Sequence, residues 1–204
     1  MINNERLSCI LQFDTASNVT LHDVAHTIHA RFGFEGTMKE TNWHLTLLSH
    51  KIGDHDMSAR NNLARSIAHH LIELPSFSFT VHGFTVYHNT AMRVATLATI
   101  DNQSFWDMQR VLYNELGIFP RLKSWKPHIT LTHSWIYWEG MRAERKMHLQ
   151  NVATTLENDR AFTHVINATR ATIGIYEIRG TLYEKRTIAD IHLAPAETAP
   201  SPAA

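Results

Sequence analysis

The sequence predicts an α+β protein built from two similar β-α-β halves with a cleft between them. Three observations predict this fold. Segments of strand and helix periodicity follow one another along the chain, the series strand, helix, glycine, tryptophan, strand occurs twice, and both copies end in the pattern histidine-apolar-threonine-leucine. With 204 residues, 44% of them hydrophobic, the chain has enough apolar material for one packed domain.

Strands are predicted where short apolar or alternating runs end at turn residues. In one of them Phe77, Phe79 and Val81 alternate with polar residues, so they are expected to share a face, and the run is expected to bend near Gly83. The last two strands are expected to form a tight hairpin at Gly180. The predicted strands are Ser8–Phe13, Trp43–Ser49, Phe77–Tyr87, Met92–Ile100, His128–His133, His164–Arg179 and Thr181–Leu193.

Helices are predicted where apolar residues recur every three or four positions between capping signals. The first has Thr20 as its expected N-cap and Gly33 as its stop, and the third stops at Gly117. A charged fourth segment is expected to be a helical insertion, over residues 139–160, that forms an exposed arm. The predicted helices are Thr20–Phe32, Ser58–Leu74, Asn102–Leu116 and most of Glu139–Asp159.

The expected domain covers residues 1–193, and its two halves repeat the same spacing. Gly33 lies 11 positions before His44, and Gly117 lies 11 positions before His128. The residues from Ala194 to Ala204 are Ala, Pro, Ser, Thr and Glu, and we expect a disordered tail there.

The two repeated motifs carry the chemistry. In a strand, alternate residues share a face, so His44 projects with Thr46, and His128 projects with Thr130. Two histidines can act as general base and general acid on a phosphodiester, because their pKa values lie near neutrality. The threonine hydroxyls can donate hydrogen bonds to the phosphoryl oxygens. The sequence therefore predicts a phosphodiester site that needs no metal or other cofactor.

Composition excludes several classes of protein. Lys plus Arg and Asp plus Glu both number 19, so a protein that coats nucleic acid by bulk charge is not expected. A single cysteine, Cys9, excludes a disulfide scaffold and a cysteine metal cage. No apolar run approaches the roughly 18–20 residues of a membrane span, and the polar start, with Glu5, is not that of a signal peptide. We expect a cytoplasmic monomer that does not bind membranes.

The motifs resemble those of the 2H phosphoesterase superfamily, which includes 2′-5′ RNA ligase-like proteins and cyclic phosphodiesterases. Trp43 to Leu47 is similar to the first motif of the family and Pro127 to Leu131 to the second, while Phe77 to Phe84 is similar to its middle strand and Ile173 to Tyr183 to its closing hairpin. The resemblance implies two antiparallel sheets around a central groove. It also implies metal-independent action on 2′,3′-cyclic phosphates or 2′-5′ linkages, with His44 and His128 as base and acid and Thr46 and Thr130 as phosphate donors. Reverse RNA ligase activity belongs to the same family, and only the resemblance points Tyr183 toward the groove.

Aromatic and basic residues around the second motif are further candidates for substrate binding. Trp125 and Lys126 precede the motif, near Arg121 and Lys123, and can bind a phosphate or stack on a base. The alternative is an ordinary solvated loop with an anchoring tryptophan, and since Trp43 has the corresponding place in the first half, packing is favoured for both tryptophans. After the motif, base stacking at the groove mouth and sealing of the charged arm are alternatives for Trp135, Tyr137 and Trp138.

The sequence is also compatible with two other functions. The chain can be a nucleotide- or RNA-end-binding module without turnover, since the pocket would look the same. It can also be a metal-dependent hydrolase, because His22, His26 and His29 follow one helix stripe at a spacing that can bind a metal.

Overall fold

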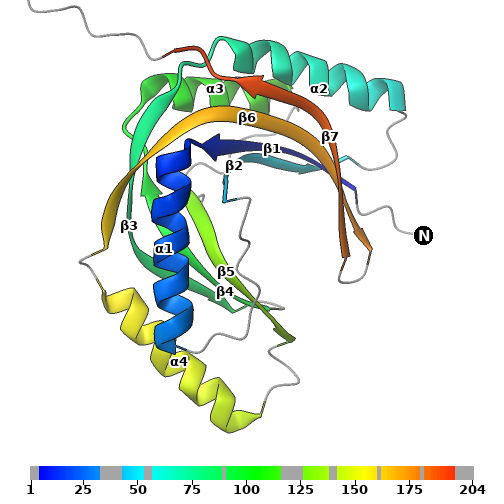
Figure 1. Ribbon diagram of the computed structural model, residues 1–204. Coiled ribbons are helices and arrows are strands. Elements are labelled where there is room, and N and C mark those ends of the chain that lie inside the picture. Colours follow the sequence, from blue (N-terminus) through cyan, green and yellow to red (C-terminus); the bar gives the residue numbers. More distant parts are fainter. Residues whose placement is uncertain are drawn as a thin grey trace, which may run out of the picture.

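Four helices and seven strands make up the described part of the chain (Figure 1). The computed structural model describes residues 5–32, 43–52, 57–88, 91–115, 126–137, 142–159, 162–179 and 182–195. The elements are, in order, β1 (Arg6–Phe13), α1 (Thr15–Phe32), β2 (Leu45–Lys51), α2 (Met57–Ile72), β3 (Phe77–His88), β4 (Ala91–Thr99), α3 (Gln103–Glu115), β5 (His128–Tyr137), α4 (Ala143–Asn158), β6 (Thr163–Arg179) and β7 (Leu182–His192).

One antiparallel sheet contains all seven strands, in the order β1-β2-β5-β4-β3-β6-β7. The long strand β6 pairs first with β3 and then with β1, so the sheet closes on itself. Its two halves meet a second time where β2 pairs with β5. The α+β fold is therefore confirmed, and the two expected sheets are the two halves of this one sheet.

The helices are exchanged between the halves. Helix α1, which follows β1, packs against β5 and β6, whereas α3, which follows β4, packs against β2 and α2. Helices α2 and α3 lie together over one half, and α4 covers β3 in the other (Figure 1). The apolar faces of all seven strands and four helices contribute to one buried cluster, which holds the sheet in shape. No helix within the described ranges has the length and hydropathy to cross a membrane.

Both repeat helices begin at a side-chain cap, and neither cap was predicted from the sequence. Helix α3 starts after Asn102, near its predicted start, and Asn102 Oδ1 accepts the N–H of Phe105 at 2.9 Å. The prediction that Thr20 caps α1 is wrong. The helix begins five residues earlier, because the Asp14 carboxylate accepts the N–H of Ser17 at 2.7 Å. Thr20 lies inside the helix, where its hydroxyl donates to the Ala16 carbonyl.

Strand β3 follows the predicted alternation. Phe77, Phe79 and Val81 are buried, while Ser78 is exposed. The bend near Gly83 is confirmed as well: Gly83 has a φ of 56°, and the pairing with β4 shifts register between His82 and Phe84.

Two expectations about the C-terminal third are wrong. The segment 143–158 is a helix, α4, but it is not an exposed arm, because Val152, Ala153 and Leu156 are buried in its contact with β3. Ala194, expected to open a disordered tail, is held in place: its N–H donates to the Leu74 carbonyl at 3.1 Å, and its carbonyl accepts the Ser76 N–H at 2.7 Å. Residues 196–204, together with the stop signals Gly33 and Gly117 and the hairpin residue Gly180, lie outside the described residues.

Candidate functional site

The four motif residues lie on, or directly next to, the strands that join the two halves. His44 immediately precedes β2 and Thr46 lies within it, while His128 begins β5 and Thr130 follows two residues later. All four are half-buried. The residues between them point the other way, since Leu45 and Ile129 are 0% exposed in the core. The predicted division of the motifs into a core face and a polar face is therefore what the structure shows.

Strand pairing brings the two motifs together. Leu45 pairs with Ile129 in the antiparallel register of β2 and β5. Continued by one residue on each side, this register sets Thr46 opposite His128 and His44 opposite Thr130. Directly opposed residues have Cβ atoms about 4.5–5.5 Å apart, and diagonal neighbours such as the two histidines about 7–8 Å. In this register the two imidazoles and the two hydroxyls would share one small area of one sheet face.

A register shift follows both motifs at the same position. On the first half the β1–β2 pairing passes from Cys9↔Leu48 to Ile10↔Thr46 and so leaves Leu47 unpaired. On the second, the β4–β5 pairing passes from Val94↔Thr132 to Ala95↔Thr130 and leaves out Leu131. Bulges of this kind bend a strand and re-aim its side chains. Each histidine-threonine pair therefore lies beside a matching distortion.

The His128 ring is oriented by two contacts. Its Nδ1 lies 2.9 Å from the Lys126 carbonyl oxygen. Because a carbonyl oxygen only accepts hydrogen bonds, Nδ1 carries the proton, which leaves Nε2 for proton exchange. The second contact is with the Tyr87 ring, whose centroid is 5.1 Å from that of the His128 ring.

Tyr87 and Arg93 belong to this face, although the motifs gave no indication of them. They pair across β3 and β4, and the Arg93 guanidinium carbon is 5.6 Å from the centroid of the Tyr87 ring. Burial raises the pKa of the Tyr87 phenol, and the Arg93 charge partly offsets this rise, so the phenol stays protonated at neutral pH. The sequence did contain one signal for Tyr87, because the alternation of β3 puts this residue on the polar face with Thr85.

Most of the other predicted substrate-binding side chains lie outside the described residues. Lys126 is exposed, and its backbone carbonyl holds His128. Tyr183 lies in β7 opposite Ile178, but its side chain is outside the description. The same holds for the side chains of Trp135 and Tyr137, which lie within β5 because this strand runs past its predicted end at His133. Trp125, Arg121, Lys123 and Trp138 lie outside the described residues.

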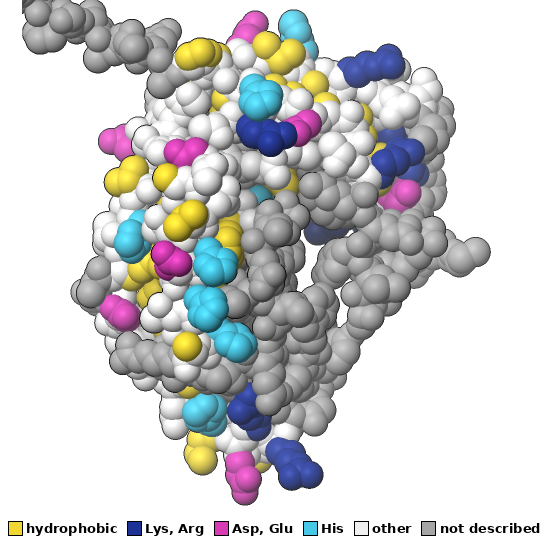
Figure 2. Space-filling model, viewed as in Figure 1, with side chains coloured by type: hydrophobic (Ala, Val, Ile, Leu, Met, Phe, Trp, Pro, Cys, Tyr) yellow, Lys and Arg dark blue, Asp and Glu magenta, His cyan; other side chains and the backbone are white. Residues whose placement is uncertain are grey.

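Histidines also gather along α1 (Figure 2). The His22 and His26 rings are 5.6 Å apart, and His22 packs edge-on against Trp43 at 6.0 Å. Trp43 is 3% exposed, so its predicted packing role is confirmed. Across the described ranges, no three His, Cys, Asp or Glu side chains are grouped closely enough to hold a metal ion. The His22, His26 and His29 stripe does not form such a group among the described residues.

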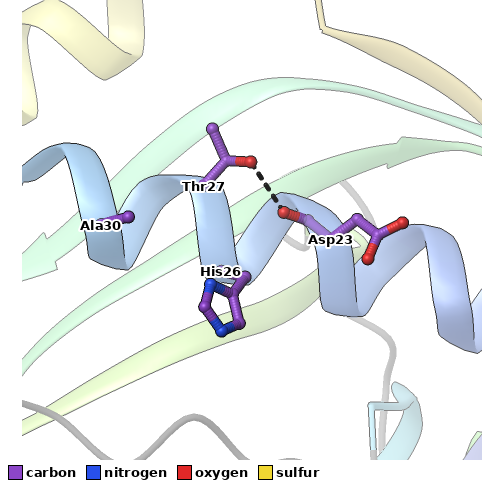
Figure 3. Close-up of a pocket in the computed structure, with 4 residues that line it drawn as sticks. All are labelled: Asp23, His26, Thr27 and Ala30. Atoms are coloured by element: carbon purple, nitrogen blue, oxygen red, sulfur yellow. Dashed lines mark hydrogen bonds between the residues drawn. The ribbon is translucent and has the colours of Figure 1, made fainter.

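A pocket on the same helix is lined by Asp23, His26, Thr27 and Ala30 (Figure 3). One of its polar groups serves the helix itself, since the Thr27 hydroxyl donates to the Asp23 carbonyl at 2.8 Å. A second cavity, of about 420 Å³, lies between α1, α4 and β3. Neither cavity is lined by a residue of the two motifs.

Comparison with known proteins identifies the fold. No family model and no curated protein matches the chain. Solved structures do match: LigT of E. coli in complex with 3′-AMP has a TM-score of 0.57 at 13% identity, over 94% of this chain and 99% of that one. The chain has the LigT fold.

Two further structures share it. TT0787 of Thermus thermophilus has a TM-score of 0.59 at 15% identity, over 94% of this chain and 99% of the other. Usb1 of Kluyveromyces marxianus has a TM-score of 0.52 at 11% identity, over 90% and 97%. The LigT fold thus extends over nearly the whole chain, and the fold implied by the resemblance to 2H phosphoesterases is confirmed.

Proposed function

We propose that this protein is a phosphodiesterase that acts without a metal on a nucleotide or RNA-end phosphodiester, of the 2′,3′-cyclic phosphate or 2′-5′-linked type. The observation that carries the proposal is the Leu45↔Ile129 pair, since the residues that flank this pair in the sequence are the two histidines and the two threonines. The LigT fold supports it, because E. coli LigT has been crystallised with 3′-AMP and with phosphate. His44 and His128 exchange protons, and Thr46 and Thr130 hold the phosphoryl oxygens.

The reaction on a 2′,3′-cyclic phosphate needs two proton transfers. The neutral histidine takes a proton from water as the water oxygen attacks phosphorus. The bond from phosphorus to one ribose oxygen breaks, and the charged histidine donates a proton to that oxygen, giving a phosphomonoester and a free hydroxyl. Hydrogen bonds from the threonine hydroxyls stabilise the charge that builds up on the non-bridging oxygens.

The orientation of His128 suits either role. With Nδ1 protonated and held by Lys126, its Nε2 is a base when neutral and an acid when charged. If a ribose hydroxyl replaces water as the nucleophile, the same two transfers join a cyclic phosphate end to another chain. This is the RNA ligase direction.

The test is a panel of diesters in the presence of EDTA. The panel contains a nucleoside 2′,3′-cyclic phosphate, a 2′-5′-linked dinucleotide and a 3′-5′-linked dinucleotide as its matched control, and products are separated by chromatography. We expect turnover of at least one of the first two, with no loss caused by the chelator. Binding without turnover would instead indicate a nucleotide- or RNA-end-binding module, and loss of turnover with EDTA would indicate a metal-dependent enzyme.

A further inference from the structure

Arg93 is a positive charge next to the proposed catalytic face. It is half-buried on β4, and its guanidinium lies over the ring of Tyr87, which in turn contacts the ring of His128. Ala95, two residues further along β4, pairs with Thr130 of the second motif. Since alternate residues of a strand share a face, Arg93 lies on the same face as Thr130.

The pairing of Arg93 differs from that of other arginines with limited exposure. Arg60 pairs with Glu5, and Arg170 pairs with Asp190. Among the described residues, no carboxylate lies within ion-pair distance of Arg93, and its partner there is the Tyr87 ring. A half-buried guanidinium keeps its charge and has donors that the aromatic ring does not satisfy. The place is therefore suited to an anion brought by a ligand.

We propose that Arg93, held by Tyr87, binds a second phosphate of the substrate, next to the phosphodiester that His44 and His128 cleave. The inference rests on the proposed function and narrows its substrate. The preferred substrate is an oligonucleotide or a nucleotide with an additional phosphate, rather than a nucleoside with a single cyclic phosphate. A guanidinium is the side chain best shaped for this contact, because it can donate two parallel hydrogen bonds to one phosphate.

Among the described residues, the equivalent place in the first half offers no such subsite. In the first half Thr46 pairs with Ile10, and Ser8, two residues before Ile10, pairs with Gly174. In the second half Thr130 pairs with Ala95, and Arg93, two residues before Ala95, pairs with Tyr87. Ser8 and Gly174 are therefore equivalent in position to Arg93 and Tyr87. Ser8 is buried, and its hydroxyl donates to the Leu48 carbonyl. Neither residue offers a charge, so the second phosphate is bound on the His128 side of the scissile group.

The experiment compares two ligands that differ by one phosphate. The first is a nucleoside 2′,3′-cyclic phosphate, and the second is a dinucleotide that ends in the same cyclic phosphate. We expect Arg93→Ala to raise KM for the dinucleotide by about tenfold or more, since a hydrogen bond to a charged group contributes about 1.5–3 kcal/mol. For the mononucleotide, kcat and KM should change by less than about twofold, because its one phosphate is held by the motif residues. Arg65→Ala, which removes an exposed arginine from α2, is the control and should change neither.

Equilibrium binding separates this proposal from the proposed function. In a His44→Ala background, which leaves the Tyr87–His128 contact intact, titration calorimetry with the same two ligands should show the same tenfold difference upon Arg93→Ala. If the wild-type protein binds both ligands and cleaves neither, the phosphodiesterase proposal fails while the subsite is still measured. Equal weakening of both ligands, or no weakening of either, would overturn the subsite. Arg93→Gln serves as a second variant if Arg93→Ala does not fold, as judged by circular dichroism.

Discussion

The two halves of the molecule match closely at the motifs and differ one strand away from them. Both present a histidine and a threonine on a strand that pairs with its counterpart, and both have a register shift at the leucine that follows. Beyond this, the second half has Tyr87 and Arg93 where the first has Gly174 and Ser8. The residues proposed for chemistry are therefore symmetric, whereas the residues beside them are not. A symmetric centre suits one phosphorus atom approached from two sides, and asymmetric flanks suit a substrate with two different ends.

Replacement of the motif histidines tests the symmetry of the centre and has the largest expected effect. His44→Ala and His128→Ala should each lower kcat for the cleaved diester by about 10²–10⁴-fold, because each removes a positioned proton-transfer group. Steady-state kinetics at several pH values measures this effect. His148→Ala, on the exposed surface of α4, is the control. A loss below about tenfold in either variant would remove that histidine from the mechanism.

The buried residues at the junction of β2 and β5 should contribute equally to the stability of the fold. Leu45→Ala and Ile129→Ala each empty a fully buried position where the halves pair. Each should lower the free energy of unfolding by about 2–5 kcal/mol, as is usual for large-to-small changes in a core. Urea denaturation followed by circular dichroism measures this loss. Ile72→Ala, at an exposed position of α2, should cost much less. A large loss in one junction variant only would show that one half dominates the stability of the fold.

The threonines should show a smaller, paired effect on catalysis. Thr46→Ala and Thr130→Ala should each reduce kcat by about 10²-fold, the cost of removing one hydrogen-bond donor from a charge-stabilising site. Thr46→Ser and Thr130→Ser keep the hydroxyl and should recover most of the rate. If serine does not recover activity, the methyl group rather than the hydroxyl is what the site requires.

Removal of the helix caps should have the smallest effect on stability, and the pH dependence of this effect should differ between the two halves. Asp14→Ala and Asn102→Ala should each lower the free energy of unfolding by about 1 kcal/mol at neutral pH. Partial burial raises the pKa of the Asp14 carboxyl, but hydrogen bonds from Ser17 and Asn167 outweigh it, and the net pKa is lowered from 3.8. A lowered pKa means that the stability from Asp14 is present above the unfolded-state pKa and is lost as the pH falls through the folded-state value.

Acid denaturation measured from about pH 7 down to about pH 2 reveals this difference between the caps. The effect of Asp14→Ala should shrink over the acidic part of the range as the wild-type carboxylate becomes protonated. The cost of Asn102→Ala should not fall because of cap protonation, since an amide does not titrate. A constant Asp14→Ala cost over the whole range would contradict the charged-cap interpretation.

Most of the fold was predictable, because periodicity reports which side of an element is buried. The strand and helix order and the polar faces of both motifs follow from it. The Asp14 cap was missed because Thr20 gives a competing capping signal further along the chain, and the α4 packing was missed because its apolar residues are interspersed with polar and charged ones. The Tyr87 and Arg93 flank depends on how β3, β4 and β5 pair. Pairing between distant strands is set by tertiary packing, which no local pattern records.

The exchange of helices between the halves has a consequence for synthesis of the chain. The apolar stripe of α1, with Leu21, Ala25 and Ile28, is covered by strands that begin at His128 and Thr163. A nascent chain therefore carries this stripe unprotected until more than half of the polypeptide has left the ribosome. Contacts so far apart in sequence form slowly and leave partly folded species prone to aggregation. Chaperone demand during translation should accordingly be concentrated on the N-terminal segment.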